Sequence, residues 1–321
     1  MISVVIPAFN EEESLEAFYK VLVPNLLKLD HSPEIIFVDD GSTDGTLEIL
    51  KSIGQKAINS KQRTGNIRIF SFRRNQGKAE ALTFGFQKAT GDYIVTLDAD
   101  LQDRPEEIGK LLNKLKEGYD LVSGWREHRK DSKLFINLPS KLFNFLSGFF
   151  WGLKLHDYNC GLKVYTSTAA KSLNLYGGMQ RFIPLLLYQN GFKIAEASVV
   201  HEVRKFGKSK YGFSKSFKEF PDMFTMLFLS RYKSRPMHFF GLVGIVLIFI
   251  GLVFLIYLTI LRFLGEQIGN RPLLVFGVLF VISGFQALFT GFIADLILNV
   301  SSESSKKTAD EDTLLKYKGE R

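Results

Sequence analysis

Two long apolar runs near the C-terminus constrain the fold of this chain more than any other feature. Residues 239–261 and 272–294 each form a run of 23 residues without a charged side chain. A helix of that length crosses a bilayer with some tilt, whereas buried helices of soluble proteins carry more polar side chains. We therefore expect a two-helix transmembrane hairpin over residues 236–300. The chain opens on an apolar, strand-like segment, so no signal peptide is expected.

The charges around the hairpin predict its orientation. Residues 201–236 contain nine Lys and Arg against three Asp and Glu, and the connection between the runs is nearly neutral. By the positive-inside rule, the N-terminal region and the tail 301–321 lie in the cytoplasm, at an inner or plasma membrane. The net charge of +8 then indicates attraction to an anionic membrane face rather than nucleic-acid binding, for which no motif is found. A single cysteine, Cys160, excludes an internal disulfide and is typical of a reducing compartment.

Before residue 125 the chain alternates strand-like and helix-like segments. Such alternation predicts an α/β fold with a parallel sheet and helices on its faces. The expected strands are 2–7, 34–39, 67–72, 92–98 and 119–124, and the expected helices are 12–28, 44–56, 77–89 and 105–117. After residue 124 the regular pattern weakens. The tail 301–321 is rich in Ser, Lys, Glu and Asp and is expected to be disordered.

Acidic side chains follow several of these strands. Asp98 and Asp100 come directly after an apolar stretch, and Asn10, Glu11, Asp39 and Asp40 end two others. Ligands of parallel α/β sheets bind beyond the carboxyl ends of the strands, so these side chains are expected to share one edge. Two carboxylates one residue apart suit a hard divalent cation that also holds a diphosphate, although Asp-x-Asp alone also occurs in ordinary turns.

With these residues the chain closely resembles the inverting nucleotide-sugar glycosyltransferases of family 2, which have the GT-A fold. Within them it is similar to the polyprenyl-phosphate glycosyltransferases related to dolichol-phosphate mannose synthase. The resemblance covers roughly residues 1–235. It is carried, in chain order, by Val-Ile-Pro-Ala-Phe-Asn-Glu, Val-Asp-Asp-Gly-Ser-Thr-Asp-Gly-Thr, Asn-Gln-Gly-Lys, Asp-Ala-Asp-Leu-Gln, Asp157-Tyr-Asn-Cys-Gly-Leu-Lys163 and Arg204-x-x-Gly-x-Ser-Lys-Tyr211.

The resemblance implies a GT-A catalytic domain over residues 1–212 and a donor site at its sheet edge. Asp98, Asp100 and Gln102 match the family's motif for Mg²⁺ or Mn²⁺, which makes Asp100 a catalytic residue as well. The cation would neutralise charge on the leaving nucleoside diphosphate. Residues 204–211 match a basic loop that folds over the donor phosphates. The implied donor-binding residues are Pro7, Ala8, Glu11, Asp39, Lys78, Asp98, Ala99, Arg204, Ser209 and Lys210.

The acceptor implied by the resemblance is a phosphate monoester on a polyprenol. Its second pKa lies near 6, so it is largely a dianion at neutral pH and needs little help from a base. Asp157 matches the family's base-like carboxylate and is expected to act as a base or as an orienting group. At residue 136, where relatives often have arginine, this chain has isoleucine. The implied ligands of the acceptor phosphate are Arg126, Arg129, Ser140 and Lys141.

Between the catalytic domain and the hairpin, phenylalanines recur at three- and four-residue spacing in residues 213–229. The spacing indicates one apolar helical face, which either packs in a core or lies on the bilayer. Its position beside a membrane span favours an amphipathic interfacial region over residues 213–235.

We therefore expect a metal-dependent, inverting transfer of one sugar to polyprenyl phosphate, with UDP-glucose and undecaprenyl phosphate as the first hypothesis. GDP-mannose with dolichol phosphate, or an amino sugar, is the alternative within the class. A processive polysaccharide synthase is disfavoured, because the chain lacks the Gln-x-x-Arg-Trp signature. A non-catalytic membrane scaffold would not need the acidic motif. A homo-oligomer formed through the transmembrane helices stays open.

Overall fold

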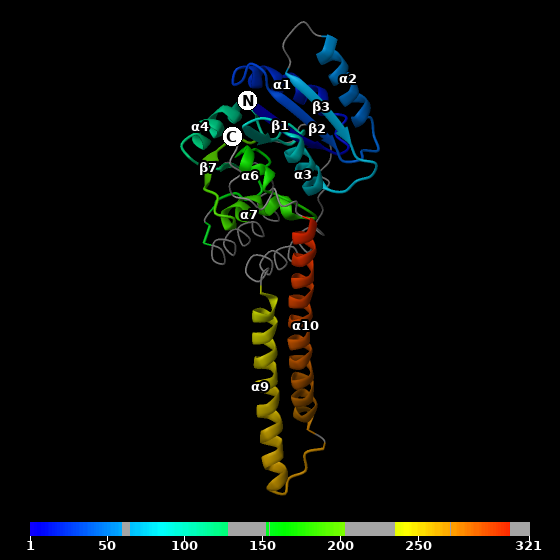
Figure 1. Cartoon of the computed structure of the whole chain (residues 1–321), viewed down its shortest axis with the longest axis vertical. Coiled ribbons are helices and arrows are strands. Elements are labelled where there is room, and N and C mark those ends of the chain that lie inside the picture. The colour runs from blue at the N-terminus through cyan, green and yellow to red at the C-terminus, as the bar shows by residue number, and fades with distance from the viewer. Residues whose placement is uncertain (60–64, 128–151, 154, 203–234, 270, 309–321) are drawn as a thin grey trace. The chain divides into compact units, whose positions relative to one another are not determined.

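The computed structural model describes residues 1–59, 65–127, 152–153, 155–202, 235–269 and 271–308. The chain divides into two compact units, Met1–Met226 and Leu227–Arg321 (Figure 1). The first contains a sheet covered by helices, and the second contains two long helices. Each unit is described by itself.

The described part of the first unit contains one seven-stranded sheet with the order β3-β2-β1-β4-β6-β5-β7. Neighbouring strands are parallel except β6, which runs antiparallel to both β4 and β5. The parallel pairing expected from the alternation before residue 125 is present in β3, β2, β1 and β4, whereas the antiparallel strand β6 was not predicted. The strands are β1 (Ile2–Ala8), β2 (Glu34–Asp39), β3 (Asn66–Ser71), β4 (Tyr93–Thr96), β5 (Leu121–Trp125), β6 (Lys163–Thr166) and β7 (Ile194–Ser198).

Helices cover both faces of this sheet (Figure 1). On β1, Val4 and Ile6 belong to one apolar core and Val5 to the other, as the two-residue period of a strand requires. The first core takes side chains from α1 (Leu15–Leu27), α2 (Thr46–Asn59) and α4 (Ile108–Leu115). The second takes them from α3 (Lys78–Lys88), α6 (Ser167–Lys171) and α7 (Ile183–Gln189).

The expected elements before residue 125 are present with small shifts at their ends. The helix expected at 12–28 begins only at Leu15, because the residues before it form a turn. The strand expected at 92–98 ends at Thr96, which leaves Asp98 beyond the sheet. The helix expected at 105–117 opens with a 3₁₀ turn, η1 (Pro105–Glu107). A second 3₁₀ turn, η2 (Met179–Phe182), precedes α7 and was not expected.

The second unit consists of α9 (Pro236–Phe263) and α10 (Pro272–Thr308). Glycines let the two helices approach closely. A Cβ on Gly244 would lie 2.7 Å from the Gly284 carbonyl oxygen, and one on Gly251 would lie 2.7 Å from that of Gly277. At both positions a larger residue would push the helices apart.

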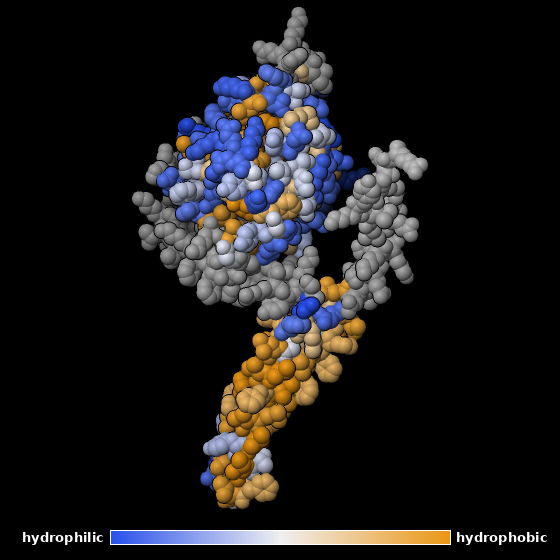
Figure 2. All heavy atoms as spheres, turned by 60° about the vertical axis from the view of Figure 1, so that its left-hand side comes forward, coloured by the Kyte–Doolittle hydropathy of each residue, from blue (hydrophilic) through white to orange (hydrophobic). Residues whose placement is uncertain are grey.

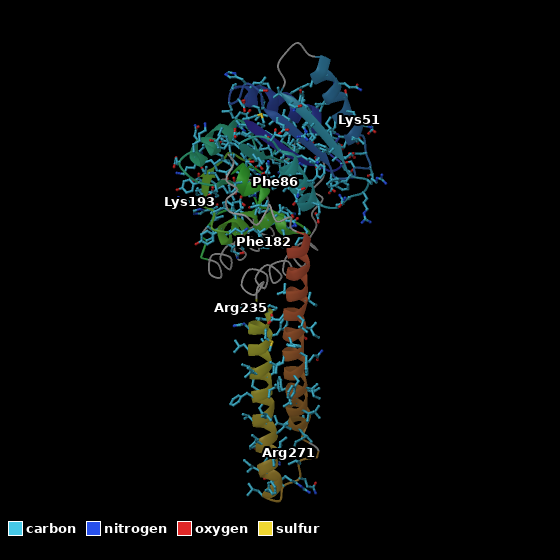
Figure 3. All side chains as sticks on the ribbon, viewed as in Figure 1. Lys51, Phe86, Phe182, Lys193, Arg235 and Arg271 are labelled. Atoms are coloured by element: carbon cyan, nitrogen blue, oxygen red, sulfur yellow. The ribbon has the colours of Figure 1, made fainter. Side chains whose placement is uncertain are left out.

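Most of the remaining surface of this pair is apolar and exposed, as Figure 2 shows for one face. Both helices contain stretches, Pro236–Phe263 and Pro272–Leu298, that are long and apolar enough to cross a membrane. Arg235 precedes α9 and Arg271 precedes α10, at opposite ends of the pair (Figure 3). These helices match the expected hairpin.

α10 continues to Thr308, into the tail for which disorder was expected. No glycine or proline lies between Gly291 and Thr308, so a helix that is already nucleated extends at little cost. Residues 301–308 belong to this helix, and residues 309–321, for which disorder stays a prediction, lie outside the described part. The interfacial region expected at 213–235 also lies almost entirely outside it.

Candidate active site

The loops after β1 and β2 are fastened to each other at the carboxyl edge of the sheet. Ser42 Oγ accepts a hydrogen bond from Asn10 N at 2.9 Å, and Asn10 Oδ1 accepts one from Thr43 N at 2.8 Å. Thr46 Oγ1 accepts one from Glu11 N at 2.8 Å. Asn10 has a φ of 51°, a conformation that asparagine tolerates better than most residues. The two loops therefore form one rigid rim.

Asp39 lies beneath this rim and is only 1% exposed. Its Oδ2 accepts from Ser71 Oγ at 2.6 Å, and its Oδ1 accepts from Ser42 N at 3.1 Å. Pro7 and Ala8 end the neighbouring strand, where Ala8 pairs with Asp39. The structure thus brings together at one edge the residues Pro7, Ala8, Glu11 and Asp39. It buries Asp39 more deeply than a contact with a nucleotide base at the protein surface would require.

Asp40 holds the next loop, residues 73–77. Its carboxylate accepts hydrogen bonds from Gln76 N at 2.7 Å, Gly77 N at 2.9 Å and Asn75 Nδ2 at 2.9 Å. Burial raises the pKa of Asp40 above its ordinary value.

Gly41, with a φ of 68°, lets the loop after β2 meet the loop 73–77, because a Cβ there would lie 2.5 Å from the Arg74 carbonyl carbon. Asp40 therefore fixes the start of α3, where Lys78 stands.

Lys78 reaches from α3 to the end of β4. Its Nζ lies 2.5 Å from Asp98 Oδ1 and 2.7 Å from Asp98 Oδ2. Both side chains are about one-third exposed, at 35% and 34%. Ala99 and Asp100 follow and are buried. Asp100 Oδ1 accepts from Gln102 N at 3.1 Å across Leu101, whose φ is 58°. The chain therefore turns sharply here and brings Asp98, Asp100 and Gln102 to the same edge.

Gly161 bears on whether a divalent cation fits beside Asp98. A Cβ on Gly161 would lie 2.7 Å from Asp103 Oδ2 and 2.8 Å from Asp98 Oδ2. The missing side chain thus lets the segment before β6 approach both carboxylates, and any larger residue would displace them. In the described part of the chain, no three His, Cys, Asp or Glu side chains converge as a ready-made metal cluster. The residues present fit a cation that takes oxygens from Asp98, Asp100 and Gln102 and its other ligands from a diphosphate and water.

Asp103 was not expected to belong to the site. It is buried, accepts from Leu162 N at 3.1 Å, and lies 3.4 Å from His201 Nδ1. Burial works against its charge, but the interactions with His201 and the charge of Arg126 hold its pKa below the ordinary value. Asp103 thus joins the β4 turn to the segment before β6. Its place in the Asp-Ala-Asp-Leu-Gln-Asp stretch was the only signal in the sequence.

Arg126 and Asp157 form a two-point ion pair on the other side of Asp98. Arg126 Nε donates to Asp157 Oδ2 at 2.6 Å, and one terminal nitrogen donates to Oδ1 at 3.1 Å. The side chains are 9% and 12% exposed. Burial opposes the charge of Arg126, but the hydrogen bond and charge of Asp157 raise its pKa above the ordinary value. The structure therefore brings together an expected acceptor ligand and the expected base-like carboxylate.

Glu196 on β7 holds the backbone of Asp157 in place and was not anticipated. It accepts hydrogen bonds from His156 N at 2.8 Å and Asp157 N at 3.0 Å, and lies 3.0 Å from His156 Nδ1. The His156 ring stacks on Trp125, with ring centroids 4.2 Å apart. These contacts come from strands far apart in sequence, so no local pattern could have indicated them.

A pocket opens beside Asp98 on the α3 and α7 face of the sheet. The polar side chains in its wall come from β4, the loop before β6, β6 itself and η2. One of these side chains, Lys163, is buried and donates a hydrogen bond to the Cys160 carbonyl oxygen. The lining residues are Lys78, Leu82, Thr96, Asp98, Asn159, Cys160, Gly161, Lys163, Tyr165, Gln180 and Ile183.

Six expected site residues lie outside the described part of the chain. They are the acceptor-side residues Arg129, Ser140 and Lys141 and the basic-loop residues Arg204, Ser209 and Lys210. Their roles stay predictions.

Comparison with known proteins identifies relatives over most of the chain. The family model for Glycosyl transferase family 2 matches residues 3–173. Dodecaprenyl-phosphate galacturonate synthase of Rhizobium johnstonii is 38% identical over 301 residues, which cover 92% of this chain and 87% of that protein. Undecaprenyl-phosphate 4-deoxy-4-formamido-L-arabinose transferase of Pectobacterium atrosepticum is 35% identical over 298 residues, which cover 92% and 88%.

Solved structures share the fold of the first unit. Glucosyl-3-phosphoglycerate synthase of Mycobacterium tuberculosis, in complex with Mn²⁺ and UDP-glucose, superposes with a TM-score of 0.51 at 22% identity. The match covers 72% of this chain and 78% of that one. At this identity the likeness concerns the fold alone, and it confirms the expected GT-A architecture with its mixed sheet.

Proposed function

The chain belongs to glycosyl transferase family 2, and we propose that it transfers one sugar from a nucleotide donor to a polyprenyl phosphate at a membrane. The observation that carries the proposal is the order of groups along one sheet edge. Asp39 is the last residue of β2, Asp98 follows β4, and the Arg126–Asp157 pair joins the end of β5 to the segment before β6. A nucleotide, a diphosphate, a sugar and an acceptor phosphate would meet that edge in the same order.

The donor nucleotide is assigned to the rim formed by the loops after β1 and β2. Pro7, Ala8 and Glu11 border this rim, and Asp39 lies below it. Each oxygen of Asp39 receives one hydrogen bond within the protein, and a carboxylate oxygen can accept a second. Asp39 could therefore still receive a ring N–H of uracil or guanine once the rim adjusts, and it would not distinguish between the two bases.

The diphosphate is assigned to the end of β4, together with Mg²⁺ or Mn²⁺. Asp98, Asp100 and Gln102 would hold the cation, which supplies Lewis-acid stabilisation of the leaving nucleoside diphosphate when bound. Lys78 pairs with Asp98, and its ammonium group is within reach of a phosphate that binds there. Ala99 lies buried between the two carboxylates and keeps the turn compact.

The acceptor is assigned to the region around Arg126 and Asp157. A polyprenyl phosphate is largely a dianion at neutral pH, so its oxygen can attack the anomeric carbon without losing a proton to the enzyme. Asp157 is bound at both oxygens by a buried guanidinium, and such a carboxylate is a weak base. We therefore assign Asp157 the role of orienting Arg126 and the acceptor, rather than that of a general base.

The acceptor class accounts for the second unit. The lipid tail of a polyprenyl phosphate stays in the bilayer, and α9 and α10 are long and apolar enough to lie in it. Both relatives are named for polyprenyl-phosphate acceptors, and the matches extend over nearly the whole chain. By the positive-inside rule the catalytic unit is assigned to the cytoplasmic side.

Two donors are proposed. UDP-glucose was the first hypothesis from the sequence. A UDP-uronate is the second candidate, because the relative from Rhizobium johnstonii is named for galacturonate and because a buried ammonium group, Lys163, lines the pocket beside Asp98. GDP-mannose is also tested below, because Asp39 would not distinguish guanine from uracil.

The direct test incubates the full chain in membranes with undecaprenyl phosphate and radiolabelled UDP-glucose, UDP-galacturonate or GDP-mannose. Label is expected in the organic phase with one of the UDP-sugars, only when the lipid phosphate and a divalent cation are present. Asp100→Asn serves as the inactive control. Label that stays in the aqueous phase with every donor would overturn the proposed function.

A further inference from the structure

Lys163 is a buried lysine that has no carboxylate partner in the part of the chain that the structure describes. It opens β6, pairs in register with Thr96 of β4 and Ser123 of β5, and is 4% exposed. It lies on the same face of the sheet as Tyr165, because side chains alternate along a strand. Among the described residues its one hydrogen-bond acceptor is the Cys160 carbonyl oxygen. An ammonium group has three donors, so its hydrogen-bonding capacity is only partly used.

Two carboxylates beside the pocket already have cations of their own. Asp98 is bound by Lys78, and Asp157 is bound by Arg126. Burial lowers the pKa of Lys163, and the charge of Lys78 acts in the same direction, whereas the charge of Asp157 opposes them. A buried ammonium group without an ion-pair partner is costly, and proteins seldom keep one without a functional reason. Among the described residues Lys163 has no such partner, although it lies at the wall of the pocket.

The pocket lies where the sugar of a bound donor is expected. In the strand order, β2 and β1 border the nucleotide rim, β4 ends at Asp98, and β6 and β5 follow. The pocket is lined from Asp98 toward β6 and η2, on the side away from the nucleotide rim. A diphosphate held at Asp98 would direct its sugar into this space. Asn159 and Gln180, which also line the pocket, offer amide groups suited to sugar hydroxyls.

We propose, building on the proposed function, that this pocket binds the donor sugar and that Lys163 selects a uronic acid by pairing with its carboxylate. A neutral hexose would leave the buried ammonium group without a counter-charge. A uronate supplies that charge and forms a charge-assisted hydrogen bond. Lys163 is then the residue that distinguishes a sugar with a carboxylate at C6 from its neutral counterpart with a hydroxymethyl group.

The test compares UDP-galacturonate with UDP-galactose, which differ only at C6. Binding to the full chain in detergent with Mn²⁺ is measured by calorimetry. We expect the wild type to bind UDP-galacturonate about ten- to a hundredfold more tightly, the range for a hydrogen bond to a charged group. Lys163→Met should remove this preference and leave UDP affinity unchanged. Lys163→Arg should retain most of it. Lys171→Met, an exposed lysine on α6, is the matched control.

Equal wild-type affinity for the two donors overturns the inference, whether or not the variants fold. A preference that survives in Lys163→Met, with UDP binding intact, also overturns it and leaves Lys163 with a structural role at the Cys160 carbonyl. If Lys163→Met does not bind UDP, Lys163→Gln replaces it as the uncharged variant.

The proposed function is tested separately. Transfer of a neutral sugar to lipid, without a preference for a uronate, would refute the inference and leave the proposed function standing. Binding of UDP-galacturonate without transfer to any lipid phosphate would refute the proposed function alone.

Discussion

Arg126 and Asp157 are 31 positions apart and meet through two hydrogen bonds, at 2.6 and 3.1 Å. Asp157 is also held through its backbone N–H by Glu196 of β7. The end of β5 and the adjacent strand β7 thus fix the orientation of a single carboxylate. An arrangement this constrained suits a group that positions substrates better than one that must pick up and release a proton.

Asp157→Asn should lower turnover strongly, because the guanidinium of Arg126 loses its counter-charge and its fixed orientation. The pH–rate profile at saturating lipid separates the two roles. If the lipid phosphate is the titrating group, the acidic limb near pH 6 persists in the variant, since the second phosphate pKa lies there. A limb that disappears with the mutation would identify Asp157 as the base, which typically contributes a factor of about 10²–10⁴.

Asp100→Asn should keep the fold and remove most of the activity. The asparagine oxygen can still accept the hydrogen bond from Gln102 N, so the turn is preserved. Loss of one negative ligand should weaken cation binding and reduce the rate by about two orders of magnitude or more, since Lewis-acid stabilisation amounts to several kcal/mol. The measurement is activity against Mg²⁺ and Mn²⁺ concentration. Normal, metal-dependent turnover in the variant would exclude Asp100 as a ligand.

Gly161→Ala should close the space between the Asp98 and Asp103 carboxylates, because the new Cβ would lie within 2.8 Å of both. We expect binding of UDP with Mn²⁺ to weaken about tenfold or more, while the Arg126–Asp157 pair is unaffected. Calorimetric titration of the full chain provides the measurement. Gly269→Ala is the control, because a Cβ at Gly269 has no neighbour within 4 Å among the described residues. Unchanged binding in Gly161→Ala would show that the space is not used.

Removal of residues 236–321 should leave a folded catalytic unit. The described sheet and both apolar cores consist of residues between Ile2 and Val199. Donor binding should persist, whereas transfer to long-chain polyprenyl phosphate in vesicles should fall sharply, because the two apolar helices are absent. The assay compares the truncated and full chains at equal protein concentration. Equal transfer rates would show that the helices do not help the enzyme reach its lipid.

Glu34→Gln should destabilise the protein at neutral pH but not in acid. Burial opposes the charge of Glu34, but hydrogen bonds from Ser3, Thr90 and Arg68 lower its pKa below 4.5. The folded state therefore gains stability above the unfolded-state pKa, and this gain is lost as the pH falls through the folded-state value. We expect a loss of about 1–3 kcal/mol at pH 7. Urea unfolding at pH 7 and below pH 4 tests this, with the exposed Glu117→Gln as control.

The sequence predicted the first half of the sheet closely because its signals are local. β1, β2 and β4 are apolar runs that end in turn residues, and each expected strand end lies within two residues of the observed one. β6 was missed, because Lys163–Thr166 is short and pairs only with strands distant in the chain. The same reasoning applies to the site. The carboxylates at strand ends are visible in the sequence, whereas the partners of Asp157 depend on the tertiary fold.

Lys163 was visible as the last residue of a recognised motif, but its burial was not. A lysine in sequence is ordinarily read as a surface residue. Only the antiparallel pairing of β6 with β4 and β5 places it inside. Asp103 and Glu196 were missed for a similar reason, since each binds backbone N–H groups of a segment remote in the chain.

The reversed direction of β6 has an evolutionary consequence. Because β5 ends and β6 begins at the same edge, the two ends of the stretch between Arg126 and Asp157 lie together, and the ion pair joins them. The entropy of closing such a loop grows only slowly with length, about 0.6 kcal/mol per doubling. Insertions and deletions there are cheap, and they leave the donor half untouched. Changes in the length of this stretch therefore need not disturb the strands β1, β2 and β4 or the carboxylates at their ends.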